Sequence, residues 1–260
     1  MKKKTIYYAR TYRHLQYQPW KNTLFFCLLV VPSLVLFILN MDYITSFLSI
    51  LAASILGKIF PGIPLNLIDS EFSILGVIKF LDLPTVYPNL SFVLINLLVT
   101  VSLILFLVTG KRVGKSVSIY LLMGLFVHLI NCIYFLFSPS YFPYNAFDYS
   151  TLYMKQQVGI WITFIILTAM FVSFMGRLGI IPKLVTFFGL LTYSFVFGAV
   201  RYIVFLYLIE KYSILYMAPM FFVFGPFFDF LYMVSIYGFF INKMITLYDS
   251  NKGREEWQWS

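Results

Sequence analysis

Long apolar runs, separated by short polar segments, dominate the chain. A helix needs about 20 consecutive apolar residues to cross the hydrocarbon core of a bilayer. Runs close to that length predict six membrane-spanning helices, over Thr23–Asn40, Leu90–Thr109, Val117–Phe137, Val158–Met175, Leu184–Ile209 and about Phe227–Lys243. The pattern therefore predicts an all-α polytopic membrane protein with a single six-helix membrane domain over residues 23–243.

The last of these runs is interrupted by the sequence FGPFFDF. Its proline, Pro226, has no backbone N–H group and favours a break in a helix. We therefore expect the continuous helix to begin after Pro226. The residues before it, Ile214–Gly225, are expected to form an outer loop or a short tilted helix.

The stretch Met41–Asn89, between the first two predicted spans, predicts a partly structured outer loop. Its first part predicts a helix lying in the membrane interface, because one helical face is apolar. The residues of that face are Ile44, Phe47, Leu48, Leu51, Ile55 and Leu56. Its second part, PGIPLNLIDSEFSILGVIKFLDLP, favours a loop stabilised by its own side chains, with a re-entrant element as the alternative.

The composition excludes an ordinary soluble domain. Hydrophobic residues make up 61% of the chain and charged residues 11%, whereas soluble domains have about 25% charged residues. If both termini are cytoplasmic, 14 basic residues fall on inner segments and 4 on outer segments, which agrees with the positive-inside rule. We therefore expect a multi-pass protein of the cell membrane, with a basic cytoplasmic segment over residues 1–22 and a cytoplasmic tail over residues 244–260.

The net charge of +9 is concentrated at the start of the chain. A nucleic-acid-binding protein would need a solvated basic domain, and the pattern contains none. The basic end suits the cytoplasmic face of a membrane and anionic lipid headgroups instead. The expected partners are the lipid bilayer and other proteins of an envelope complex, not a nucleic acid.

Two opposite charges lie inside the apolar runs, Arg201 and Asp229. With a rise of about 1.5 Å per helical residue, both fall in the outer half of the membrane. One buried charge alone is strongly unfavourable, so we predict that the two side chains interact, directly or through water. The pair could form a pocket for an anionic lipid or glycan. It could equally be a structural link between two helices.

A second candidate site is formed by His128 and Cys132, which lie at positions i and i+4 on one helical face. A thiol beside an imidazole can become a nucleophilic thiolate, and a nearby Arg201 would favour that charge. The catalytic candidates are therefore Cys132, His128 and Arg201. The alternative is that Cys132 fills space and His128 is a satisfied core residue. No motif predicts a cofactor, and two histidines are too few for a His-rich metal site.

The segment GRLGIIPKLVTFFGLLTYSFVFGAVRYIVFLYL combines an inner basic turn with a helix that carries Arg201, and FGPFFDFLYMVSIYGFF forms a last span. Over the C-terminal part of the chain, this arrangement resembles the exosortase/archaeosortase family of polytopic membrane transpeptidases. That family is expected to have a Cys before one span, then an inner basic turn, then a helix with an Asn-x-x-Arg motif, and then a His on the last span. Here Gly198 replaces the Asn, Asp229 stands near the position of the His, and Cys132 lies one helix too early.

Three functions remain open at this level. The resemblance, with its displaced cysteine, implies a catalytically degenerate subunit of a bacterial system that assembles surface polysaccharides or surface proteins. An outward-facing cysteine transpeptidase built on Cys132 is the second. The third is a transporter or lipid-handling subunit that binds an anionic group through Arg201.

Overall fold

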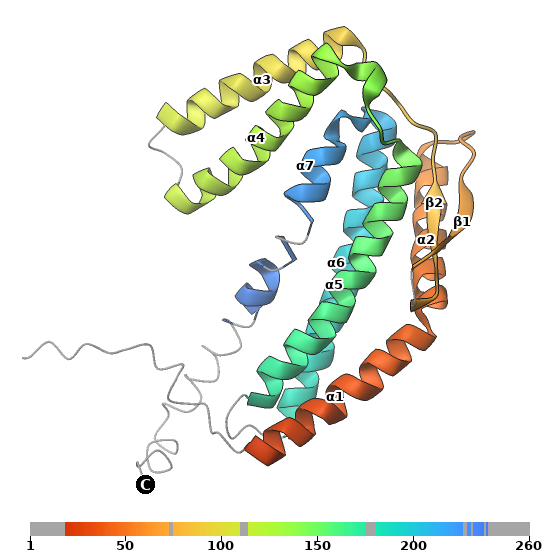
Figure 1. Cartoon of the computed structure of the whole chain (residues 1–260), viewed down its shortest axis with the longest axis vertical. Helices are drawn as coiled ribbons and strands as arrows, with labels where there is room; N and C mark the ends of the chain where they lie inside the picture. The colour runs from red at the N-terminus through yellow and green to blue at the C-terminus, as the bar shows by residue number, and fades with distance from the viewer. Residues whose placement is uncertain are drawn as a thin grey trace, which may run out of the picture. The chain divides into compact units, whose positions relative to one another are not determined.

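The computed structural model describes residues 19–72, 75–109, 114–174, 180–225, 228–229, 231–236 and 238. Seven α-helices, two strands and two short 3-10 helices are assigned within these ranges (Figure 1). In chain order they are α1 Pro19–Leu39, α2 Met41–Ile59, β1 Asn66–Glu71, β2 Val77–Asp82, α3 Leu90–Thr109, α4 Lys115–Phe137, η3 Pro139–Tyr141, α5 Ala146–Phe174, α6 Ile180–Lys211, η4 Ile214–Tyr216 and α7 Met217–Phe222.

Six of the described helices, α1 to α6, are long and apolar enough to cross a membrane. The predicted fold class, an all-α polytopic membrane protein, is therefore confirmed. The observed α3 has the predicted bounds, and α4 and α6 differ from prediction by only a few residues at their ends. Both termini were predicted to be cytoplasmic, and that orientation stays a prediction.

The six helices are not the same six that the sequence predicts. The segment expected to lie in the interface is α2, a 19-residue helix with a mean hydropathy of 1.3, sufficient for a span. The last predicted span, about Phe227–Lys243, lies mostly outside the described residues, although residues 231–236 are helical. Before it, η4 and α7 form the short helical segment that was one of the two expectations for Ile214–Gly225.

Helix α5 begins at Ala146, well before the predicted start at Val158. Its first turn is closed by a reciprocal capping box between Asn145 and Asp148. The Asn145 side chain accepts a hydrogen bond from the Asp148 backbone N–H at 2.8 Å, and the Asp148 carboxylate accepts one from the Asn145 N–H at 3.0 Å. Such an arrangement satisfies N–H groups that a helix start otherwise leaves unpaired. The polar stretch 146–157 is consequently part of the same helix as the predicted fourth span.

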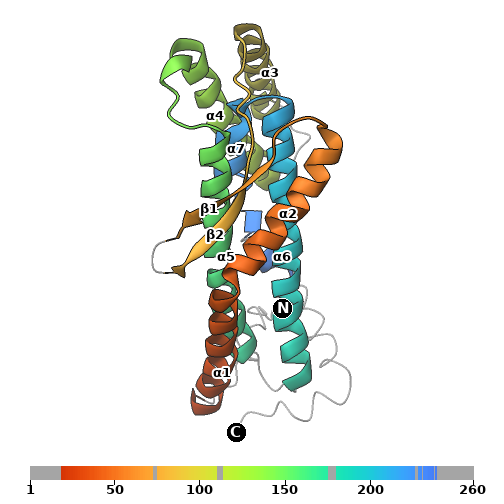
Figure 2. The ribbon, with the colours of Figure 1, turned by 90° about the vertical axis from the view of Figure 1, so that its right-hand side faces the viewer.

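A β-hairpin replaces the loop favoured for residues 61–84. Strands β1 and β2 pair antiparallel, from Asn66 opposite Asp82 to Glu71 opposite Val77. Near the turn, Gly76 has φ +119°, a conformation that residues with a side chain rarely adopt. Helix α2 lies against β2 (Figure 2).

The free edge of β2 is covered by side chains from distant helices. The Lys79 N–H donates to Oγ1 of Thr45 at 3.1 Å, and Oγ of Ser49 donates to the Lys79 carbonyl at 3.0 Å. The Leu81 N–H donates to the hydroxyl of Tyr202 on α6 at 3.0 Å. An uncovered strand edge exposes unpaired backbone groups, so these three bonds explain why a two-stranded sheet is stable here.

Two compact units make up the chain. The first contains the described residues within Met1–Leu34, Ile162–Ser194 and Phe230–Ser260. Inside it, the Tyr232 hydroxyl bonds to Oγ of Ser194 at 2.8 Å, and its ring packs edge-on against Phe164. The second unit contains Val35–Trp161 and Phe195–Asp229, and it holds every candidate site residue. Its largest fully buried side chains include Tyr149, Tyr153 and Tyr202.

Candidate functional site

Arg201 is the centre of a buried polar cluster in the second unit. The residue is 6% exposed, within a helix long enough to span a membrane. Its Nε donates to the hydroxyl of Tyr153 at 2.6 Å, and its Nη2 donates to Oε1 of Gln157 at 2.6 Å. Both acceptors come from α5. The guanidinium therefore joins α6 to α5 through two directed, charge-assisted hydrogen bonds.

The third nitrogen of Arg201 binds the end of the segment Met217–Gly225, which is called the interrupted segment. Its Nη1 donates to the carbonyl oxygens of Phe224 at 2.9 Å and Gly225 at 3.2 Å. Backbone carbonyls at a helix break have no partner in a hydrocarbon environment unless another group supplies a donor. The Gly225 carbonyl also accepts from the backbone N–H groups of Phe228 at 3.1 Å and Asp229 at 3.3 Å, and the cation adds a further donor to it and one to Phe224. Arg201 thus caps the end of the short helical segment.

Asp229 completes the cluster with the opposite charge. Its Oδ2 lies 2.7 Å from Nη1 of Arg201, and its side chain is 0% exposed. The predicted interaction between Arg201 and Asp229 is confirmed as a direct ion pair. Its use as a pocket for an anion stays a prediction. All three guanidinium nitrogens already donate to acceptors of the protein, which is the arrangement of a structural link.

Gly198 makes the close approach of α5 and α6 possible. A Cβ atom on this residue would lie 2.5 Å from Nε2 and 2.7 Å from Cδ of Gln157. The Tyr153 hydroxyl also donates to the Gly198 carbonyl, at 3.2 Å. The absent side chain therefore leaves the space in which the Gln157 amide reaches Arg201. A side chain at this position would displace the Gln157 amide from its place beside Arg201.

Tyr153 and Gln157 were not among the candidates from sequence. They lie in the polar stretch 146–157, before the predicted start of the fourth span at Val158. The signal that could have found them is the capping box at Asn145 and Asp148, which starts α5 early enough to include both residues. At i and i+4 they share the helical face that meets Arg201.

His128 and Cys132 form a second, separate cluster. Sγ of Cys132 lies 3.6 Å from Nε2 of His128, as their spacing on α4 predicts. The imidazole stacks on the ring of Tyr216, with centroids 5.2 Å apart and planes 6° apart. Within the described part of the chain, neither residue hydrogen-bonds to Arg201. The three catalytic candidates are thus not brought together, and the catalytic role of Cys132 stays a prediction.

Burial limits the chemistry of this second cluster. Cys132 is 0% exposed, and His128 is 8% exposed. A nucleophile must approach its substrate to within bonding distance, which an enclosed thiol does not do without rearrangement. Across the residues that the structure describes, no group of three or more His, Cys, Asp or Glu side chains is placed to hold a metal ion.

No family model, curated protein or solved structure matches the chain.

Proposed function

We propose that the chain is a non-catalytic integral membrane subunit of a bacterial cell-envelope system that assembles surface polysaccharides or surface proteins. The observation that supports it best is the enclosure of the Cys132 thiol and of the Arg201 guanidinium. Cys132 is fully buried, and the guanidinium of Arg201 is held by Tyr153, Gln157 and Asp229. A cysteine transpeptidase needs an accessible thiol, and bidentate recognition of an anion needs N–H groups that are not already used. The enclosed thiol and the bonds already made by all three guanidinium nitrogens therefore favour a structural role for both groups.

In this proposal Arg201 and Asp229 have a structural role. They hold the interrupted segment Met217–Gly225 against α5 and α6, and so fix one surface of the unit for a protein partner. The envelope context comes from the resemblance of the C-terminal part to the exosortase/archaeosortase family. A relative that kept the membrane helices and lost the nucleophile would act by binding, not by transpeptidation.

The proposal is tested by complementation of a strain that lacks this protein. Surface polysaccharide and anchored surface proteins are measured in the deletion strain, and then after expression of the wild-type chain or of Cys132→Ser. We expect the deletion to impair one of these outputs, and both the wild type and Cys132→Ser to restore it fully. The matched control is Cys27→Ser, because Cys27 is exposed and belongs to neither cluster.

A Cys132→Ser chain that reaches the wild-type level in the membrane but fails to complement would overturn the proposal. That result would favour a cysteine transpeptidase. A deletion strain with unchanged surface polysaccharide and surface proteins would remove the envelope context.

A further inference from the structure

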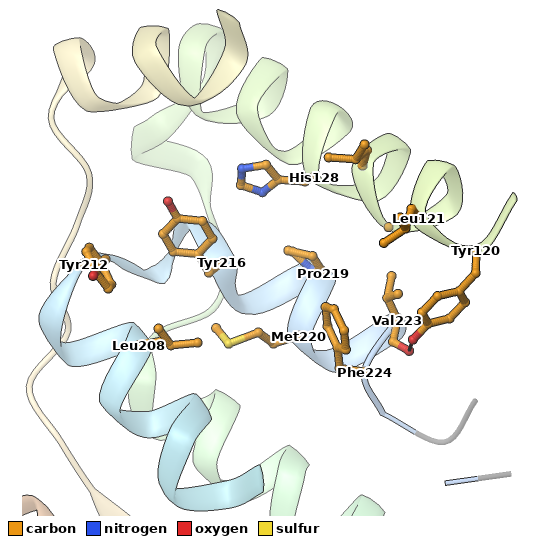
Figure 3. Close-up of a pocket in the computed structure, with 12 residues that line it drawn as sticks. Tyr120, Leu121, His128, Leu208, Tyr212, Tyr216, Pro219, Met220, Val223 and Phe224 are labelled. Carbon is orange, nitrogen blue, oxygen red and sulfur yellow. Dashed lines mark hydrogen bonds between the residues drawn. The ribbon is translucent and has the colours of Figure 1, made fainter. Parts of the chain in front are cut away.

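A cavity of about 420 Å³ lies beside His128 in the second unit. Its walls come from α4, the end of α6, η4 and α7 (Figure 3). Small-molecule sites in proteins usually measure about 300–1,000 Å³ and are mostly apolar. Here the walls include Leu121, Leu208, Met220 and Val223, and none of the described lining residues is Lys, Arg, Asp or Glu. The cavity suits an uncharged, apolar guest.

The polar side chains in this wall are His128 and three tyrosines, Tyr120, Tyr212 and Tyr216. Nε2 of His128 faces Cys132, and its Nδ1 is buried without a hydrogen-bond partner among the described residues. The ring is fixed by stacking on Tyr216, whose hydroxyl donates to Oδ1 of Asn96 at 2.7 Å. Figure 3 shows the imidazole projecting from α4 over the space above Pro219 and Met220. A buried polar atom without a partner is unfavourable, so a guest that hydrogen-bonds to Nδ1 gains affinity.

The position of His128 restricts the polar group of that guest. The residue lies about 20 Å along α4 from its first residue, inside a candidate span. A charged headgroup at this depth would need a counter-charge, and the wall offers none among its described residues. A hydroxyl group both donates and accepts, so it fits Nδ1 in either tautomer of the ring.

We propose that this cavity binds the apolar chain of an uncharged lipid whose hydroxyl group hydrogen-bonds to Nδ1 of His128. Leu121, Tyr212 and Phe224 line the cavity and are 40–46% exposed, so a chain can enter from the surrounding lipid. The site differs from the Arg201 cluster in its residues and in the charge of its ligand. It does not depend on the proposed envelope function.

The test uses the full chain in phosphatidylcholine nanodiscs and a hexadecanol probe with a diazirine in its chain. After photolysis, the labelled peptides are identified by mass spectrometry. We expect saturable labelling within residues 120–128 and 216–224, displaced by unlabelled hexadecanol. Labelling spread evenly over the lipid-facing helices, without saturation, would overturn the proposal.

Cavity-filling variants locate the site. Leu208→Trp fills the space, and labelling should fall about tenfold, a change worth one strong contact. The matched control is Val204→Trp, one turn earlier on α6, exposed and outside the cavity, where labelling should not change. If Leu208→Trp does not fold, Gly124→Leu fills the same cavity from α4. Its control is Gly189→Leu, because a Cβ on Gly189 meets nothing within 4 Å. If a folded cavity-filling variant is still labelled at the wild-type level, the cavity is not the binding site.

A third variant tests the hydroxyl contact. His128→Phe keeps a ring to stack on Tyr216 and removes Nδ1. Apparent affinity for the hexadecanol probe should fall roughly tenfold, the usual effect of losing one buried hydrogen bond. Affinity for the matching hexadecane probe should change less than about twofold by the same reasoning. An equal loss for both probes would overturn the assignment of the hydroxyl to His128.

Discussion

The ion pair between Arg201 and Asp229 predicts a large and strongly non-additive effect on stability. Its two atoms are 2.7 Å apart, and the side chains are 5% and 0% exposed. Removing one partner of such a pair leaves an uncompensated buried charge, which costs about 3–5 kcal/mol. Asp229→Asn should therefore lower the free energy of unfolding by about 3–5 kcal/mol. Arg201→Gln should lower it by at least as much, because the bond from Nε to Tyr153 is lost as well.

The double variant separates pairing from the two individual losses. When both charges are removed, no uncompensated charge is left in the interior. We expect the double variant to be about 3 kcal/mol more stable than the sum of the two single losses would give. The control is the pair of Lys79 and Asp42, whose charged atoms are 3.5 Å apart and whose side chains are 30% and 44% exposed. An exposed pair of this kind should give a coupling energy of about 0–1 kcal/mol.

Both cycles can be measured by reversible unfolding of the purified chain in mixed micelles, with increasing SDS and tryptophan fluorescence as the signal. Each variant is compared with wild type at the same detergent composition, so that only differences in unfolding free energy are used. The reasoning is refuted if the Arg201 and Asp229 losses simply add. It is refuted as well if their coupling energy is no larger than that of the exposed control pair.

Three further predictions follow from single contacts. Gly198→Ala should destabilise the chain by about 1–3 kcal/mol, because the new Cβ overlaps the Gln157 amide; SDS unfolding measures the loss. Tyr202→Phe should speed hydrogen exchange at the Leu81 amide roughly tenfold or more, because that buried N–H loses its acceptor; amide exchange monitored by mass spectrometry measures the rate. Cys132 should not react with a maleimide in the folded protein and should react fully in SDS, because the thiol is completely enclosed; intact mass measures the adducts.

Each of these predictions has an internal control. Gly189→Ala should be neutral or stabilising, by up to about 1 kcal/mol, because its Cβ meets no other atom within 4 Å. Tyr43→Phe should leave exchange at Leu81 unchanged, since Tyr43 is 74% exposed. Cys27 lies on the exposed surface of α1, within a candidate span, so a membrane-permeable maleimide should label it faster than Cys132 before unfolding. Equal effects at a test site and its control would contradict the corresponding argument, and so would labelling of Cys132 in the folded chain.

The long helices were predictable because their length and apolarity are properties of the chain itself. Helix α3 has the predicted bounds, and α4 and α6 were placed within a few residues. Hydropathy was a poor guide where a helix carries polar residues inside the fold. The N-terminal part of α5 contains Tyr153 and Gln157, which hydropathy leaves outside the predicted span, although both are buried. Capping by Asn145 and Asp148 was the better local signal.

The hairpin could not be predicted from its own residues. Neither strand alternates strictly between apolar and polar positions, and β1 carries Asp69, Ser70 and Glu71 in a row. Its stability comes from bonds to Thr45 and Tyr202, which are 34 and 121 positions from their backbone partners. Contacts of that separation follow from the tertiary arrangement of the helices. The residue pattern of the hairpin segment does not predict these contacts.

The ion pair was predictable for an energetic reason. Two opposite charges within apolar runs cannot each remain alone in a membrane, so the sequence implied that Arg201 and Asp229 meet. Neutral partners carry no comparable penalty and therefore leave no comparable signal. The hydroxyl of Tyr153 and the carbonyls of Phe224 and Gly225 were accordingly missed. The sequence therefore identified the charge of Arg201 but not the neutral groups that accept its hydrogen bonds.

The residues that follow α7 lie at both the Arg201 cluster and the cavity beside His128. Phe224 gives its carbonyl to Arg201, and its side chain lines the cavity beside His128. One residue of the interrupted segment thus belongs to the buried ion-pair cluster through its backbone and to the proposed lipid site through its ring. In a continuous helix the Phe224 carbonyl would pair with the N–H group four residues on, so it would be less available to Arg201. The segment that ends α7 therefore has two roles, because its carbonyls accept hydrogen bonds from the buried cation and its side chains form one wall of the cavity.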